Sequence, residues 1–213
     1  MRRRRYLTVG FGLTATVIGG PGATTAVEDD LEEPDPIGFE GDGATVTDAF
    51  TLEGGVTIVE AVHDGESNFV VELVPTDGDR RHLLVNVIGD FDGAAGVLVD
   101  DGEYLLDVDA DGAWALEVLQ PRATADEAES LPVTLDGASP TWAGPLRFDG
   151  LGTATGSHDG QGNFIVEVLL QDDHFPALVF NELDSFEGET TFTVEGVGYV
   201  TAEAAGPWTL TLE

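Results

Sequence analysis

Two short polar sets, 95 positions apart, carry the side chains of this chain that are best suited to binding chemistry. An imidazole, a carboxamide and a carboxylate recur in the same order, first as His63, Asn68 and Glu72 and then as His158, Asn163 and Glu167. Such groups can hydrogen-bond sugar hydroxyls or hold a cation. We therefore predict one small outward-facing polar patch in each copy. The alternative is a hairpin in which an Asp-Gly turn and the Asn side chain satisfy local backbone groups while the Glu side chain is solvated.

A second candidate site is a row of aspartates. Asp107, Asp109 and Asp111 match the first half of the D-x-D-x-D-G calcium-loop pattern. The second half fails, because Val118 occupies the position of the required acid and Glu117 comes one place early. A calcium ion at these aspartates is one hypothesis, and a strand with outward carboxylates that runs into an Asp-Gly hairpin is the other. No other cofactor is expected.

Trp142 stands apart from the other aromatic residues. It lies between Pro140 and Gly144, and the first copy has Thr47 in its place. We expect it either to pack between the two copies or to be exposed for a ligand.

The sequence contains no pattern of a known catalytic centre. A G-x-S-x-G elbow, an H-E-x-x-H zinc motif, a phosphate-binding loop and any cysteine are all missing. Carboxylate pairs of the kind that hydrolyse glycosides are abundant, and nothing selects one of them. We therefore expect a protein that is not an enzyme.

Acidic residues dominate the charge. The 213 residues include 41 Asp plus Glu against eight arginines and no lysine. Arg2 to Arg5 supply half of the arginines, so cleavage after Ala26 would leave four against 41 acids, a net charge of −37. Molar salt shortens the Debye length to roughly 3 Å and relieves the resulting self-repulsion. The composition is typical of proteins from salt-loving archaea, and it argues against nucleic acid as a partner, because the phosphates would be repelled.

The N-terminus has the pattern of an export signal. Residues 1–26 combine a charged start, an apolar stretch from Tyr6 to Gly20 and small residues before the expected cleavage point. Arg3-Arg4-Arg5-Tyr6-Leu7 resembles a twin-arginine signal. The apolar stretch is shorter than the roughly 20 residues of a membrane span, so we expect cleavage, no span in the mature chain, and an extracellular or cell-surface location. Residues 27–41, rich in acids and proline, are expected to be a disordered acidic linker.

Beyond the polar sets, the chain repeats itself. Seven of the ten residues from His63 to Glu72 recur identically between His158 and Glu167. The similarity continues through Leu84-Val85 and Leu178-Val179, Phe91 and Phe186, Gly93 and Gly188, Tyr104 and Tyr199, and Trp114 and Trp208. We predict two copies, at 42–121 and 133–213, joined by a polar linker at 122–132.

Alternating hydrophobicity predicts strands within each copy. Phe69, Val71 and Leu73 share one parity, as do Trp114, Leu116 and Val118, so these two sets are expected in the core. Short apolar runs near 44–52, 56–62, 68–74, 83–88, 95–99, 103–109 and 113–119 are separated by Asp-Gly turns. The predicted fold is all-β, with two tandem antiparallel, jelly-roll-like β-sandwich domains.

The unit resembles small tandem β-sandwich modules of exported haloarchaeal and bacterial proteins, which share an N-F-x-V-E strand, a later G-x-Y and a closing G-x-W strand. In this chain the motifs are Asn68–Glu72, Gly102-Glu103-Tyr104 and Gly112-Ala113-Trp114, then Asn163–Glu167, Val197-Gly198-Tyr199 and Gly206-Pro207-Trp208. Val197 departs from the glycine of the pattern. The resemblance covers both copies and implies a fold and a location, but no activity. A looser similarity to carbohydrate-binding and pre-peptidase C-terminal sandwiches favours binding by analogy.

These observations favour a non-catalytic, extracytoplasmic binding or adhesion module whose partner is a surface glycan or another envelope protein. The alternatives are a structural cell-surface protein without a small ligand and a calcium-stabilised module. The oligomeric state is left open.

The charge imbalance generates a stability prediction. We expect the mature protein to melt at a markedly higher temperature in molar salt than in dilute buffer, because screening relieves the repulsion among its carboxylates. Thermal unfolding followed by circular dichroism across a salt series measures this, and equal midpoints at both extremes would contradict it.

Overall fold

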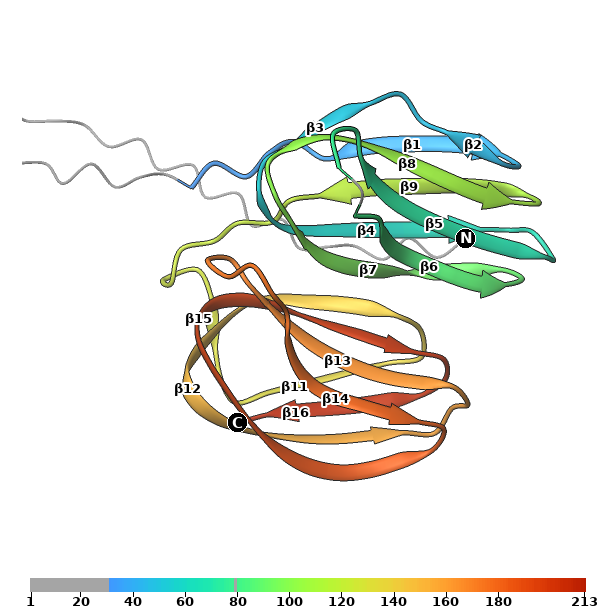
Figure 1. Ribbon diagram of the computed structural model, residues 1–213. Coiled ribbons are helices and arrows are strands. Elements are labelled where there is room, and N and C mark those ends of the chain that lie inside the picture. The colour runs from blue at the N-terminus through green and yellow to red at the C-terminus, as the bar shows by residue number, and fades with distance from the viewer. Residues whose placement is uncertain (1–30, 79) are drawn as a thin grey trace, which may run out of the picture. The chain divides into compact units, whose positions relative to one another are not determined.

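The computed structural model describes residues 31–78 and 80–213, and these residues form β-strands and no helix (Figure 1). The predicted all-β class is therefore confirmed. No segment of this described chain forms an apolar helix of membrane-spanning length. The expected signal peptide at 1–26 and the first residues of the acidic segment lie outside the described residues.

The first half of the described chain is a sandwich of two antiparallel sheets. Its strands are β1 (Ile37–Asp42), β2 (Thr45–Val46), β3 (Phe50–Leu52), β4 (Gly55–His63), β5 (Asn68–Pro75), β6 (His82–Ile88), β7 (Phe91–Val99), β8 (Gly102–Ala110) and β9 (Ala113–Leu119). One sheet has the order β1-β9-β4-β7, and the other has β2-β8-β5-β6 with β3 also paired to β8. This order is typical of jelly-roll sandwiches.

The second half repeats this order with longer strands. It contains β10 (Glu129–Ser130), β11 (Val133–Gly137), β12 (Thr141–His158), β13 (Asn163–Leu170), β14 (Ala177–Leu183), β15 (Phe186–Ala204) and β16 (Trp208–Leu212). They form one sheet, β11-β16-β12-β15-β13-β14, to which β10 adds a short parallel pair with β12. Strand β12 takes the place of β2, β3 and β4, and β15 that of β7 and β8. Gly150 and Gly196, with φ of 106° and 126°, lie within these long strands, close to the points where the first-half strands break.

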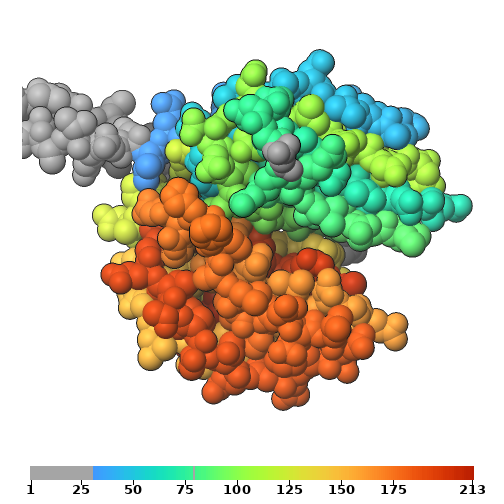
Figure 2. Space-filling model, in the orientation of Figure 1, coloured from blue at the N-terminus to red at the C-terminus, as the bar shows by residue number. Residues whose placement is uncertain are grey.

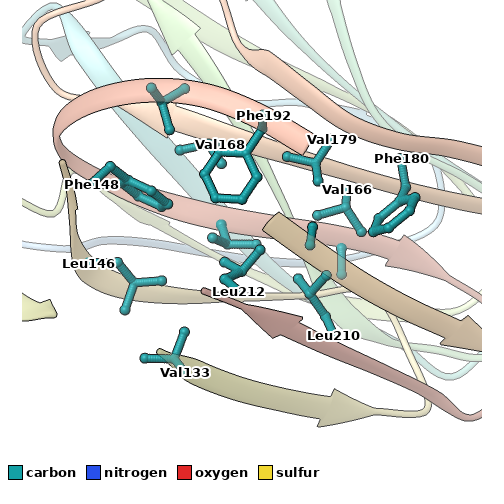
Figure 3. Packing of buried hydrophobic residues seen from close by; sticks show 14 of the residues in the cluster. Val133, Leu146, Phe148, Val166, Val168, Val179, Phe180, Phe192, Leu210 and Leu212 are labelled. Atoms are coloured by element: carbon teal, nitrogen blue, oxygen red, sulfur yellow. The ribbon is translucent and has the colours of Figure 1, made fainter. Parts of the chain in front are cut away.

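Each half has a hydrophobic core of its own. In the first half, Phe69, Val71 and Leu73 of β5 face Trp114, Leu116 and Val118 of β9, and all six are buried as their parity predicts. In the second half, side chains from β11 to β16 converge in the same way (Figure 3). A third cluster contains Val56, Ile58 and Ala94 of the first half with Leu169 and Tyr199 of the second, so apolar contacts also join the halves.

Strand β1 corrects the expected boundary between linker and first copy. Residues 37–41 were predicted to be disordered, yet they belong to β1, which pairs antiparallel with β9 from Ile37 opposite Val118 to Asp42 opposite Ala113. Ile37 and Phe39 pack against the first core. The alternation of this short strand is masked in the sequence by the acids and prolines that precede it.

The segment 122–132, predicted to be a polar linker, is held to the second half by hydrogen bonds. The backbone N–H of Ala123 donates to Gln171 Oε1 at 2.7 Å, and Gln171 Nε2 donates to the Ala123 carbonyl at 2.9 Å. Ala123 is buried. Glu129 and Ser130 form β10.

A tryptophan seated on a glycine occurs once in each half. Trp114 lies opposite Gly41 and donates its indole N–H to the Gly43 carbonyl at 2.9 Å, while Trp208 lies opposite Gly137 and donates to Ser139 at 3.3 Å. A Cβ on Gly41 would overlap the Trp114 ring, and one on Gly137 would come within 2.8 Å of the Trp208 ring. Gly41 of β1 and Gly137 of β11 therefore leave the space that the two indole rings occupy.

The pairing of Tyr104 with Tyr199 in the repeat does not hold in space. Glu72 lies opposite Asp107 and Glu167 opposite Thr201, so the register equates Tyr199 with Leu105. Because a shift of one residue moves a side chain to the opposite face of a strand, Tyr104 lies in the first core whereas Tyr199 joins the cluster between the halves.

We predict that Gly41→Ala and Gly137→Ala each destabilise the protein by about 1–3 kcal/mol, because the added methyl group overpacks the indole. Gly38→Ala, in the same strand as Gly41 but with open space at its Cβ, is the control. It should be neutral or stabilising by up to about 1 kcal/mol. Denaturant unfolding in molar salt measures all three, and equal losses for Gly38→Ala and Gly41→Ala would contradict the steric argument.

Candidate functional site

A cleft of about 480 Å³ lies between strands of the two halves. One wall is the outer face of β13 and β15, and the other consists of β6 and β7. The lining includes Leu83–Val87 and Ala94–Val97 on one side and Asn163, Ile165, Glu167 and Thr201–Glu203 on the other. This volume is within the range of roughly 300–1,000 Å³ that is common for ligand sites.

The cleft exists because β7 approaches the second half closely at one point. A Cβ on Gly96 would come within 2.8 Å of side-chain atoms of Leu169, Thr201 and Ile58. Trp142 adds a polar contact nearby, as its indole N–H donates to Glu60 Oε1 at 2.9 Å. The two halves touch at Gly96, while next to this contact β6 and β7 are separated from β13. The facing surfaces of these strands form the cleft walls.

Polar side chains of β13 and β15 make up the acidic wall, a name used below for Asn163, Glu167, Thr201 and Glu203. Asn163 Nδ2 donates to Glu203 Oε1 at 2.9 Å, and Glu167 lies directly opposite Thr201. Burial raises the pKa of Glu167, and the neighbouring Glu203 carboxylate raises it further. The wall thus offers carboxylates, a carboxamide and a hydroxyl, which suit hydroxyl groups or a cation.

The opposite wall is made of strand edges. In the described chain, β6 pairs only with β5, and β7 only with β4. Five consecutive residues of β6 line the cleft, so the backbone contributes to the wall as well as side chains. The space-filling view shows β6 in green and β14 in orange at the molecular surface (Figure 2).

Two of the residues predicted from the sequence lie in the cleft, namely Asn163 and Glu167. Their first-copy counterparts lie on the outer face of β5, outside this cleft; Asn68 is exposed and Glu72 is partly buried. Glu72 pairs there with Arg81 at 2.8 Å, and Arg81 also reaches Asp107 at 3.3 Å. The structure therefore places the equivalent polar sets in different surroundings.

The predicted outward patch is wrong for both histidines. His63 and His158 are buried, stacked on Phe69 and Phe164 with ring centroids 4.5 and 5.4 Å apart. Their Nδ1 atoms lie 2.9 and 2.8 Å from the carbonyl oxygens of Gly89 and Asp184. On β4, His63 shares the inward parity of Val59 and Ala61, which explains its burial.

Trp142 is located between the halves. It is partly buried against the joining cluster, with its ring centroid 5.9 Å from that of Tyr199. Of the two hypotheses for this residue, the structure supports packing between the copies.

The three aspartates do not form a shared pocket. Asp107 and Asp109 project from the outer face of β8, and Asp111 accepts backbone hydrogen bonds from Glu66 at 3.2 Å and Ser67 at 3.0 Å. Within residues 31–78 and 80–213 no group of three potential metal ligands is clustered. This geometry matches the alternative of a strand that runs into a hairpin.

Sequence reasoning missed Glu203, Thr201 and the edge of β6. Glu203 and Thr201 stand where the first copy has Asp109 and Asp107. The signal that could have identified this wall is the replacement of Asp107 in the first copy by Thr201 in the second, at equivalent positions on the outer face of the sheet.

A second hollow of about 470 Å³ mixes both signs of charge, with Arg80, His82 and His174 near Asp100 and Asp101. Burial lowers the pKa of His82, and Arg80 lowers it further, while Asp100 acts in the opposite direction. None of the residues predicted to bind a ligand lines it, so the first cleft is the stronger candidate.

No protein-family model and no curated protein sequence matches this chain. A cupin 2 conserved barrel domain protein from Leptotrichia buccalis aligns at 10% identity over 85% of this chain and 89% of its own, with a TM-score of 0.23. The oxalate decarboxylase of Lactobacillus farciminis, in a formate complex, aligns at 9% identity over 81% and 77%, with a TM-score of 0.20. A variant of the Bacillus subtilis oxalate decarboxylase aligns at 12% identity over 80% of this chain and 68% of its own, with a TM-score of 0.19. Similarities this low carry no argument about function.

The raised pKa of Glu167 generates a pH prediction. Its pKa in the folded state lies above the ordinary value of 4.5, so the native protein binds more protons between those two values and loses stability as the pH rises through them. We therefore expect Glu167→Gln to raise the melting temperature at neutral pH and to leave it nearly unchanged below the ordinary glutamate pKa.

Melting curves at fixed molar salt and several pH values measure this effect. Glu72→Gln is the matched control; it removes an exposed ion pair, so it should change stability by no more than about 1 kcal/mol. A lower melting temperature for Glu167→Gln than for wild type at neutral pH would contradict the assignment.

Proposed function

We propose that this chain is an exported, non-catalytic binding module of the cell envelope, built from two tandem β-sandwich domains, and that its ligand site is the cleft between β6–β7 and β13–β15. The observation that carries the proposal is the acidic wall, with Glu167, Glu203 and Asn163 held together opposite two strand edges. These groups recognise a ligand through hydrogen bonds and charge.

The chemistry of the cleft supports binding over catalysis. Its described lining offers two carboxylates, two carboxamides and one threonine hydroxyl, together with apolar side chains. The lining holds no histidine, lysine, serine or cysteine, and Glu167 and Glu203 lie together on one wall, whereas glycoside hydrolysis uses two carboxyl groups that flank the bond to be broken. Removal of the Glu167 or Glu203 charge from the cleft should therefore change the affinity of the protein for its ligand.

Charge limits the ligand to neutral or cationic chemistry. The mature chain would carry a net charge of −37, and the acidic wall adds local negative potential, so anionic ligands are repelled. A neutral surface glycan and an envelope protein segment with a basic residue both meet this condition. The twin-arginine-like start at Arg3-Arg4 supports a partner outside the cytoplasm.

Binding to envelope material in brine tests the proposal. A cleft variant, Asn163→Ala with Glu167→Gln, is compared with the matched variant Asn68→Ala with Glu72→Gln, which changes the equivalent residues outside the cleft. Loss of the hydrogen bonds and charge should weaken capture by the cleft variant about tenfold or more, whereas the matched variant should behave as wild type.

Both variants must first melt within a few degrees of wild type in the same salt. The panel includes immobilised neutral glycans and a detergent-solubilised envelope fraction. Equal capture by both variants, or no capture by wild type, would favour the structural surface protein without a small ligand.

A further inference from the structure

We propose that the cleft binds its ligand by β-strand addition: an extended segment of a partner protein pairs with the free edge of β6 and lays a lysine or arginine side chain against Glu167 and Glu203. This inference rests on the proposed binding function and specifies its ligand class. Its basis is the combination of an unpaired strand edge and an acidic wall on opposite sides of one cleft.

The edge of β6 is open for pairing. The strand runs from His82 to Ile88, pairs only with β5 among the described strands, and places Leu83 to Val87 along the cleft. On the side away from β5, alternate residues present N–H and C=O groups without a strand partner, which is the arrangement that accepts an added strand.

The sequence of this edge lacks the usual protection. Strand edges are commonly guarded by charged side chains on the strand itself. Between Arg80 and Gly89 there is no acidic residue, although the chain contains 41. Leu83 and Ile88 are 56% and 81% exposed. A strand that adds here would therefore meet apolar side chains and free backbone groups, with no carboxylate on β6 to repel it.

The acidic wall determines which side chain the added strand should carry. Burial raises the pKa of Glu167, and the nearby Glu203 carboxylate raises it further, while the described lining contains no lysine, arginine or histidine to neutralise the two carboxylates. A cationic side chain from the ligand supplies the missing positive charge. Charge complementarity thus favours a basic residue at the position facing β13.

A glycan fits this cleft less well than a peptide. The single aromatic residue of the lining is Phe91, which is only 9% exposed, so the described walls offer no open ring for stacking on a sugar. The continuous backbone edge, in contrast, matches the repeat of an extended chain.

The second half contains the natural comparison. Strand β14 is the equivalent edge, with Leu178 and Leu183 exposed at the positions of Leu83 and Ile88. Both edges also have a register shift at the same place, opposite Glu72 and Glu167. Only the β6 edge lines the cleft with the acidic wall opposite, so only β6 should show selectivity for charge.

The probes are three blocked pentapeptides of alternating threonine and valine, which span about 17 Å when extended. The first has lysine at the centre, the second has glutamate there, and the third has the lysine with two alternate backbone nitrogens methylated. Affinity is measured by fluorescence anisotropy on the mature chain in molar salt, and the binding strand is located by amide hydrogen exchange.

We expect the lysine peptide to bind and to slow exchange in β6 but not in β14. The glutamate peptide should bind at least about tenfold more weakly, because a third carboxylate enters the acidic wall. Each methylated nitrogen that removes a backbone hydrogen bond should weaken binding roughly three- to tenfold.

Matched double variants separate charge selection from strand pairing. Glu167→Gln with Glu203→Gln should abolish the preference for lysine while β6 remains protected. Glu72→Gln with Asp109→Asn, at the equivalent positions of the first half, should leave both readouts unchanged.

Equal affinity for the methylated and unmethylated peptides, protection of β14 in place of β6, or no peptide binding at millimolar concentration would overturn strand addition. If neutral glycans protect the cleft while the peptides do not, strand addition fails and the binding function stands. If no ligand of either kind protects the cleft, both proposals fail.

Discussion

The close approach of Gly96 on β7 to Leu169 and Thr201 is the contact on which the arrangement of the two halves depends. Because Gly96 has no Cβ, the outer faces of β4 and β7 can bury Val56, Ile58 and Ala94 against Tyr199. A larger residue would hold these faces apart and expose the cluster. The cleft borders this contact, so its width and the distance between its walls follow from the same packing.

Charge and burial divide the surface between two roles. The outer face of β5 and β8 carries Glu72, Asp107 and Asp109, whose repulsion molar salt and Arg81 relieve. At the equivalent outer positions of the second half, Thr201 replaces Asp107, and Tyr199 replaces Leu105. These exchanges turn a solvated acidic face into one that can accept an apolar neighbour, while Glu167 and Glu203 keep its open end polar.

Local patterns in the sequence predicted most of the architecture. Alternation placed Phe69 and Trp114 in the core, and Asp-Gly turns such as Asp64-Gly65 and Asp111-Gly112 marked several strand ends of the first half, because these features depend on neighbours along the chain. The burial of His63 was not predicted, because a polar residue next to a turn is typical of the protein surface. The alternation along β4 extends to His63 and places its side chain in the core. The edge of β6 could not be predicted, because a free edge depends on which strands meet across the fold, and on how the two halves pack.

Strand β15 repeats β7 with different outward residues, and this makes the outer face of the second half unlike the face that β7 buries. Where β7 has Ala94, Gly96 and Leu98 facing outward, the register places Glu189, Thr191 and Thr193 in β15. The Glu189 carboxylate and the two threonines therefore replace the small apolar surface that β7 presents to the second half, and the outer face of β8 carries the carboxylates of Asp107 and Asp109. Both outer surfaces are thus more polar than the buried contact at Gly96, as the outward faces of terminal repeats in a solenoid are.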